Sequence, residues 1–323
     1  MKVLVTGGDG LLGGNLVRRL LDKEYEVKVL IHPSSDSPTL ENLAIDKVTG
    51  DILDIDSLKK AVRGCKAVFH VAASTAMWPP LDAKITAVNV TGTANMLLAA
   101  RDENVERFIH TGSASSFGYG TKHKPGTEES PYGYNNLRLA YFESKLEAQK
   151  MVLRQAKEGI IDAVVVNPTF MIGPYDSQPS SGKVILKFLQ LKAPFYPPGG
   201  RCFIHAGDAA EGMISALTKG RTGECYILGN ENLEMKEFLT MVAEVAGVAP
   251  PRYKIPDKAM ISAGRIASGL AAATKKVPEL TYEIAKVSCI GSYYSAGKAV
   301  RELALPQTPV KEAVEEAYRW LTN

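Results

Sequence analysis

The stretch KVLVTGGDGLLG, residues 2–13, decides the fold class of this chain. Residues 2–6 predict a buried strand, and a helix pattern begins at Leu11 directly after the glycines. Glycines at positions 7, 10 and 13 permit a tight turn, close backbone approach to a pyrophosphate and close helix packing. Free amides and the positive end of the helix dipole can then hold the phosphates. An ordinary strand-to-helix turn is the alternative, but the flanking strand and helix favour a dinucleotide loop.

Strand and helix patterns alternate through the first half of the chain. The predicted strands are 2–6, 26–31, 47–48, 67–70, 107–111 and 162–167, and the predicted helices are 11–21, 57–62, 88–104 and 140–157. Such alternation predicts parallel pairing with crossover helices, hence an α/β fold with a doubly wound parallel sheet, the Rossmann fold. We assign residues 1–168 to a dinucleotide-binding domain. Prolines punctuate shorter elements beyond it, so residues 169–323 are predicted to form a smaller, mainly helical substrate-binding region, interleaved with the end of the sheet.

Composition and charge exclude several classes of protein. The chain has 323 residues, 45% of them apolar, and its formal charge of +3 includes no long basic run, so no nucleic-acid partner is predicted. The four cysteines show no metal-ligand spacing, which suits a reducing cytosol without a metal site. The first residues enter a strand at once, leaving no room for a signal peptide. No apolar run reaches the ~18 residues of a membrane helix. We therefore expect a soluble cytoplasmic protein without a membrane partner.

A tyrosine followed four residues later by a lysine is a short pattern with a high chance frequency. It occurs three times, as Tyr141 with Lys145, Tyr282 with Lys286, and Tyr294 with Lys298. A catalytic pair must lie beside the C-terminal ends of parallel strands, where the cofactor sits. Only Tyr141 follows a strand pattern, 107–111, that leads into a small polar segment, 112–116. We interpret the other two pairs as solvated helix positions.

Two further strand ends are candidates for cofactor contacts. Asp51 and Ile52 follow the third strand, where a carboxylate can accept the adenine amino group; a helix cap is the alternative role for Asp51. Val71, Ala72 and Ala73 follow the fourth strand, where small residues let the backbone approach the cofactor. His70, just before them, is interpreted as a structural histidine.

The end of the second strand bears on the choice between NAD and NADP. NAD preference usually needs an acidic residue there, to bind the ribose 2′-hydroxyl. This chain has His32, followed by Pro33, Ser34 and Ser35, which would not repel a 2′-phosphate and could donate to it. Asp9 in the glycine loop argues the other way. We predict NADP, with NAD as the alternative.

These features together resemble the extended short-chain dehydrogenase/reductase superfamily, which includes nucleotide-sugar epimerases. Six motifs in family order carry the resemblance: 6–13, 69–73, 89–93, 113–118, 141–145 and 167–174. Within the superfamily the chain looks most similar to the dihydroflavonol-reductase-like and cinnamoyl-CoA-reductase-like carbonyl reductases. The motifs cover nearly the whole chain, but they specify the superfamily much better than the substrate.

The resemblance implies roles for individual residues. Ser113, five residues before Gly118, matches the catalytic hydroxyl, and Tyr141 with Lys145 matches the catalytic pair. Asn89 matches a position that the family uses structurally or in proton relay, and we favour the structural role. The cofactor-binding residues that we predict are Gly7, Gly10, Leu11, Leu12, Gly13, His32, Asp51, Ile52, Val71, Ala72, Ala73, Tyr141, Lys145 and, in the turn that resembles the nicotinamide carboxamide site, Pro168, Thr169 and Met171.

The chemistry of carbonyl reduction agrees with this assignment. It requires a hydride at carbon and a proton at oxygen, and a free tyrosine with a pKa of ~10 exchanges protons poorly at neutral pH. Lys145, one helical turn along, would favour the phenolate through its charge and could bind the nicotinamide ribose. Ser113 would be a second donor to the carbonyl oxygen.

The leading hypothesis is therefore an NAD(P)H-dependent reductase of a ketone or aldehyde, acting on a small-molecule carbonyl substrate. The alternative is a nucleotide-sugar epimerase with tightly bound NAD, because Arg201 in 200–205 resembles an epimerase arginine that contacts the nucleotide diphosphate; a surface or lid position is its other interpretation. A dinucleotide-sensing regulator is disfavoured, since such proteins usually lack the tyrosine or the lysine. Outer faces of the helices 88–104 and 140–157 that we take as apolar predict a possible homodimer.

Overall fold

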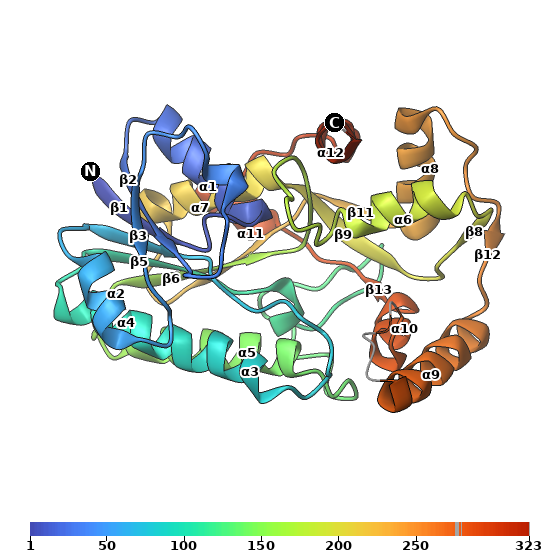
Figure 1. The fold of residues 1–323 in the computed structure, drawn as a ribbon, viewed down its shortest axis with the longest axis horizontal. Helices are drawn as coiled ribbons and strands as arrows, with labels where there is room; N and C mark the ends of the chain where they lie inside the picture. Colours follow the sequence, from blue (N-terminus) through green and yellow to red (C-terminus); the bar gives the residue numbers. More distant parts are fainter. Residues whose placement is uncertain (275–277, 279, 323) are drawn as a thin grey trace.

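A seven-stranded parallel sheet forms the centre of the molecule (Figure 1). The computed structural model describes residues 1–274, 278 and 280–322. Its strands in spatial order are β10 (Cys225–Leu228), β6 (Ala163–Pro168), β5 (Arg107–Thr111), β4 (Ala67–His70), β1 (Lys2–Thr6), β2 (Glu26–Ile31) and β3 (Asp46–Thr49). Every neighbouring pair is parallel. The order reverses direction beside β1, so the predicted doubly wound Rossmann fold is confirmed.

Helices cover both faces of this sheet (Figure 1). One face carries α1 (Leu11–Asp22), α7 (Ala206–Lys219) and α11 (Gly297–Leu303), and the other carries α2 (Ile55–Val62), α4 (Gly92–Asp102) and α5 (Ala140–Lys157). Successive side chains of β1 alternate between the two cores: Val3 and Val5 pack in the first, and Leu4 in the second. Both faces of the strand are thus buried, which explains its continuous apolar sequence.

Residues beyond 168 contribute to the sheet and also form a separate lobe. The helix α7, the strand β10 and the helix α11 complete the parallel sheet and its cover. The remaining elements are the strands β7 (Phe170–Ile172), β9 (Gly200–His205), β11 (Glu231–Glu234) and β13 (Gly291–Ser292) of a four-stranded sheet, the pair β8 (Phe195–Tyr196) and β12 (Tyr253–Lys254), and the helices α6 (Lys183–Leu191), α8 (Met235–Ala246), α9 (Asp257–Thr274), α10 (Tyr282–Ser288) and α12 (Val310–Thr322). The sequence analysis did not anticipate the four-stranded sheet. Among the described helices, none has the length and apolar character to cross a bilayer.

The helix predicted over 88–104 differs from the structure. Helical structure starts at Ala83, where α3 (Ala83–Thr86) is capped by Asp82, whose carboxylate accepts the Lys84 amide. A π-helical segment, η2 (Ala87–Thr91), joins α3 to α4, and α4 ends at Asp102. Short π-helical segments interrupt helices mainly at functional sites. Here the segment carries Asn89.

The expectation of apolar outer helix faces is wrong for α5. Its exposed positions are occupied by charged residues, among them Glu143, Glu147, Lys150 and Arg154. On α4 the exposed large apolar side chain is Leu98. The apolar helix bundle on which the predicted homodimer depended is therefore not available on these two helices.

Candidate active site

One cavity of about 580 Å³ lies along the carboxyl ends of β1, β2, β4, β5 and β6. Every residue that the sequence analysis assigned to catalysis or to cofactor binding lines it, from Gly7 to Met171. Lining residues to which the sequence analysis gave no role include Asp176 and Gln178. Crevices outside the carboxyl ends of parallel strands are the binding sites of doubly wound sheets.

Two glycines of the loop, Gly7 and Gly13, have no room for a side chain. Gly7 has φ +65, and a Cβ there would lie 2.8 Å from the Ala72 amide nitrogen. A Cβ on Gly13 would overlap the Gly7 carbonyl oxygen. The helix α1 begins after Gly10 without a side-chain cap. Its first amides are thus left for another acceptor, and such a cradle fits the pyrophosphate of a dinucleotide.

The end of β4 is held by a buried chain of polar contacts. The amides of Val71 and Ala72 both donate to Thr6 Oγ1 at 3.1 Å. The same oxygen lies 2.9 Å from His70 Nδ1, and His70 Nε2 lies 3.1 Å from Thr93 Oγ1. Burial, with a smaller effect of the Lys145 charge, lowers the pKa of His70 to about 3. A neutral imidazole with two partners agrees with the structural role expected for His70.

The three candidate catalytic residues meet at the opposite end of the cavity from His32. Tyr141 opens α5, and burial raises its pKa above the usual value, while a hydrogen bond with Ser113 lowers it. Ser113 Oγ also lies 2.7 Å from Ser115 Oγ. Lys145 is 4% exposed and donates to the Thr111 carbonyl oxygen at 2.5 Å.

The electrostatics of this trio differ from the expectation. Burial lowers the pKa of Lys145 to about 8. The ammonium lies against a backbone carbonyl, and burial, not the lysine, dominates the pKa of Tyr141. A phenol with a raised pKa stays protonated at neutral pH, so the Tyr141 hydroxyl keeps its proton there. The expected stabilisation of the phenolate by Lys145 is not seen in this arrangement.

Asn89 fixes the position of α5. Its amide oxygen accepts the Ser74 amide at 2.7 Å, and its nitrogen donates to the Ser74 carbonyl oxygen and to Ser144 Oγ. Ser144 in turn donates to the Tyr141 carbonyl oxygen. Both ends of the Asn89 side chain are thus used to join the loop after β4 to the first turn of α5, which favours the structural role.

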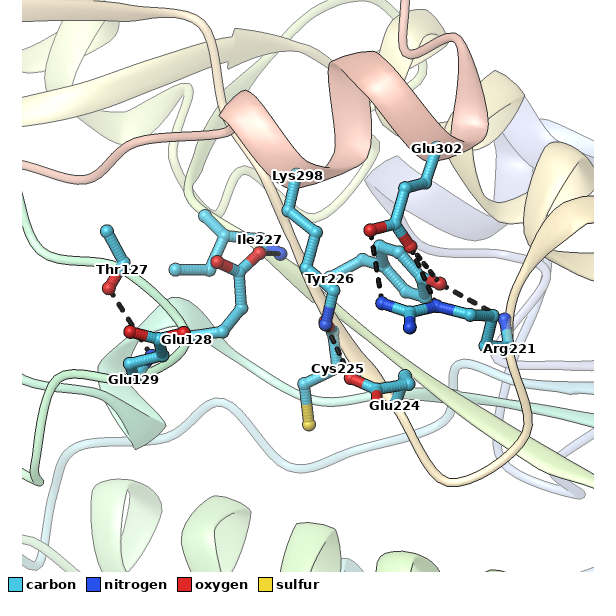
Figure 2. Close-up of polar contacts among 10 residues, drawn as sticks. All are labelled: Thr127, Glu128, Glu129, Arg221, Glu224, Cys225, Tyr226, Ile227, Lys298 and Glu302. Carbon is cyan, nitrogen blue, oxygen red and sulfur yellow. Dashed lines mark hydrogen bonds and ion pairs between the residues drawn. The ribbon is translucent and has the colours of Figure 1, made fainter.

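The other two tyrosine–lysine pairs lie outside the cavity. Tyr294 is 4% exposed, and its hydroxyl lies 2.9 Å from that of Tyr134, so its interpretation as a solvated helix position is wrong. Figure 2 shows Lys298 reaching from α11 to Glu224 and to the Cys225 carbonyl oxygen. The strand β10 lies at one edge of the seven-stranded sheet, where backbone groups lack a neighbouring strand. The Lys298 ammonium donates a hydrogen bond to one of these backbone acceptors.

Two carboxylates, Asp9 and Asp51, line the cavity together with His32. Asp9 accepts a hydrogen bond from the Ser35 hydroxyl. Asp51 Oδ1 accepts the Leu53 amide, and Asp51 Oδ2 lies 3.7 Å from His32 Nε2. The cap of α2 is Asp54, not Asp51. The hydrogen bond from Ser35 to Asp9 was not anticipated from the sequence, because it depends on the fold of the loop after β2.

Arg201 is not on the surface of a lid. Its guanidinium donates to the carbonyl oxygens of Gly200, Ile290 and Val287 at 2.7, 2.8 and 3.0 Å. These contacts join β9 to the C-terminal end of α10. The guanidinium is thus engaged in holding two segments together.

Comparisons with known proteins give one consistent picture. The sequence pattern of the NAD dependent epimerase/dehydratase family matches residues 3–229. A putative dihydroflavonol 4-reductase from Synechocystis sp. is 35% identical over 324 residues, which span 99% of this chain and 94% of the relative. The crystal structure of gox2253 has a TM-score of 0.86 at 33% identity and covers 99% of this chain and 97% of its own. A nucleoside-diphosphate-sugar epimerase from Pseudomonas aeruginosa has a TM-score of 0.80 at 25% identity, with coverages of 99% and 97%.

Proposed function

This chain belongs to the NAD dependent epimerase/dehydratase family of extended short-chain dehydrogenases/reductases, and we propose that it reduces a ketone or aldehyde to an alcohol with NADPH. The family acts on alcohol or carbonyl groups with a nicotinamide dinucleotide. The observation that carries the finer proposal is the meeting of Ser113, Tyr141 and Lys145 in the same cavity as the glycine loop. The reductase name of the Synechocystis relative supports the same direction.

The proposed mechanism assigns one task to each of the three side chains. When bound, the reduced nicotinamide supplies the hydride. Tyr141, whose pKa burial raises, gives its phenolic proton to the carbonyl oxygen, and Ser113 donates a second hydrogen bond to that oxygen. Lys145 would hold the nicotinamide ribose through its ammonium, whose pKa burial lowers to about 8. The apolar residues Met77 and Tyr132, which pack with Tyr141, favour an organic substrate.

The cofactor preference is testable by titration. We expect NADPH to bind more tightly than NADH, because no carboxylate ends β2 and His32, whose Nδ1 accepts the Ser34 amide, has Nε2 left to donate to a 2′-phosphate. In fluorescence titrations, His32→Ala should weaken NADPH binding about tenfold, the effect of losing one hydrogen bond to a charged group. NADH binding should change little. Equal affinities, or tighter NADH, would refute the 2′-phosphate role and point to Asp36 or the backbone as ribose partner.

The variant Asp9→Asn provides a matched test of the opposing charge. The Asp9 carboxylate of the unaltered protein accepts a hydrogen bond from Ser35, lines the same cavity as His32 and would repel a 2′-phosphate. The amide keeps the size and can still accept from Ser35. NADPH affinity should therefore rise in this variant, with NADH affinity unchanged.

The alternative, an epimerase with retained NAD, is favoured by the fold match to a sugar-nucleotide epimerase and by the motif around Arg201. The engagement of that guanidinium with three carbonyl oxygens counts against it. A reductase must exchange its cofactor in every cycle. We expect protein purified without added cofactor to carry little dinucleotide, as measured by release on denaturation.

A thermal-shift screen completes that test. A ligand at a hundredfold excess over its Kd stabilises a protein by about 2.7 kcal/mol. NADP⁺ should therefore raise the melting temperature, whereas UDP-sugars and GDP-sugars should not. Co-purified NAD⁺ together with a clear shift from one sugar nucleotide would make the epimerase the better assignment.

A further inference from the structure

The most exposed large apolar side chains gather at one end of the molecule. Leu191, Phe195, Tyr253, Ile266 and Leu270 are 72%, 52%, 59%, 65% and 61% exposed, more than any other large apolar side chain of the described residues. They belong to the end of α6, to β8, to β12 and to α9. Figure 1 shows these elements together at the end of the long axis farthest from the N-terminus. A concentration of this kind marks an interaction surface more often than scattered single residues do.

The helix α9 presents an apolar stripe to solvent. Ala259, Ala263, Ile266, Leu270 and Ala273 are all exposed, and their spacing of four, three, four and three residues places them on one helix face. The opposite face is packed on α10: a Cβ on Gly264 would lie 2.6 Å from the Ala285 Cβ. The helix α9 therefore has apolar residues on its solvent-exposed face as well as contacts with α10 on the other face.

Cations outnumber anions on α9 and in the segment that leads into it. Between residues 248 and 274 the charged side chains are Arg252, Lys254, Lys258 and Arg265 against Asp257, and all five are exposed. Four cations less one anion give +3 for this stretch, equal to the formal charge of the whole chain. Exposed apolar and basic side chains on one segment are the combination that binds the interface of a membrane with anionic lipids.

We propose that this end of the molecule, the docking surface formed by α9 with β8 and β12, binds an anionic bilayer peripherally. Ile266 and Leu270 would enter the boundary between headgroups and acyl chains, and Lys254 and Lys258 would lie at lipid phosphates. Peripheral docking needs no membrane-spanning helix. A second copy of the chain fits less well, because a stripe with three alanines falls far short of the roughly 20–30 residues a side of a stable interface.

The helix behind the docking surface, α10, contacts an apolar cluster that includes a residue of the candidate site. On the inner side of α10 and just after it, Val287 and Ile290 pack against the apolar cluster that includes Met77 and Tyr141. The helix α10 thus lies between α9 and the apolar cluster beside Tyr141.

Co-sedimentation of the purified protein with vesicles tests the docking directly. The probes are vesicles of phosphatidylcholine alone and of phosphatidylcholine mixed with phosphatidylglycerol. We expect binding to the anionic vesicles that weakens as salt rises. Lys254→Glu with Lys258→Glu should reduce it by at least about 25-fold, at about fivefold for each lost cation. Ile266→Ser with Leu270→Ser should reduce it about tenfold or more.

Matched variants elsewhere on the surface separate local from general effects. Lys150→Glu with Lys157→Glu on α5 changes the net charge equally, and Leu98→Ser removes an exposed leucine from α4. Both should bind anionic vesicles as the unaltered protein does. NADPH affinity and thermal unfolding verify that each variant folds, so a failure of docking is distinguishable from a failure of the reductase proposal. Absence of binding to anionic vesicles, or equal losses in the control variants, would overturn the inference. So would a dimer in gel filtration that Ile266→Ser with Leu270→Ser dissociates.

Discussion

Replacing Tyr141 with phenylalanine is expected to lower kcat for carbonyl reduction by at least about 10²-fold, with the Kd for the cofactor nearly unchanged. The substitution removes only the phenolic hydroxyl, whose proton is transferred to the substrate oxygen in the proposed mechanism. The ring is partly buried in the first turn of α5 and packs in an apolar cluster, so phenylalanine can occupy the same space. Steady-state kinetics with a carbonyl substrate, and direct titration of NADPH, measure the two quantities separately.

The other tyrosine–lysine pairs supply matched controls. Tyr282→Phe should leave kcat unchanged, because Tyr282 lies at the start of α10 and outside the cavity. Tyr294→Phe removes a buried hydroxyl that bonds to Tyr134, so it should cost stability of about 1 kcal/mol but little activity. If Tyr141→Phe kept more than half of the activity while either control lost it, the choice of Tyr141 among the three pairs would be wrong.

The Rossmann sheet could be predicted because its signal is local. Runs such as Val164-Val165-Val166 are apolar on both faces, and each lies next to a helix pattern in the sequence. The four-stranded sheet was missed because its strands are short and partly exposed, and β13 joins β9 from about 90 residues along the chain. No periodicity in a two-residue strand distinguishes it from a loop. The π-helical turn at Asn89 was missed because its sequence pattern does not differ from that of an α-helix.

The candidate site was predictable for a topological reason. In a parallel sheet the carboxyl ends of all strands meet at one edge, so Gly7, His32, Val71 and Ser113 could be placed together without coordinates. Contacts between loops could not be predicted in this way. Two such contacts are the hydrogen bond from Ser35 to Asp9 and the hydrogen bonds from Arg201 to three carbonyl oxygens. Both depend on how segments far apart in the sequence pack against each other. The sequence motif suggested a free arginine for a diphosphate, but tertiary packing uses its donors.

The second large effect is expected from Gly13→Ala. Alanine in place of glycine inside an exposed helix usually stabilises by about 1 kcal/mol. At Gly13 the sign should reverse, because the new Cβ would overlap the Gly7 carbonyl oxygen and lie 2.6 Å from Gly8 Cα. Both are backbone atoms of the turn that approaches the pyrophosphate, so the turn must open to admit the methyl group. We expect a loss of cofactor affinity of at least about 100-fold, equivalent to about 2.7 kcal/mol, together with a lower melting temperature.

Gly14→Ala, one residue further along α1, is the control that isolates the contact. A Cβ there would lie 3.4 Å from Tyr175 Cβ and 3.7 Å from the Gly8 carbonyl oxygen, both ordinary separations. Gly14→Ala should therefore keep its cofactor affinity and gain a few tenths of a kcal/mol or more in stability. The two variants share the same helix and the same chemical change, so only the fit against the glycine turn distinguishes them. Equal cofactor affinity in both would show that α1 need not approach the turn this closely, and the cofactor would then have to be held elsewhere in the cavity.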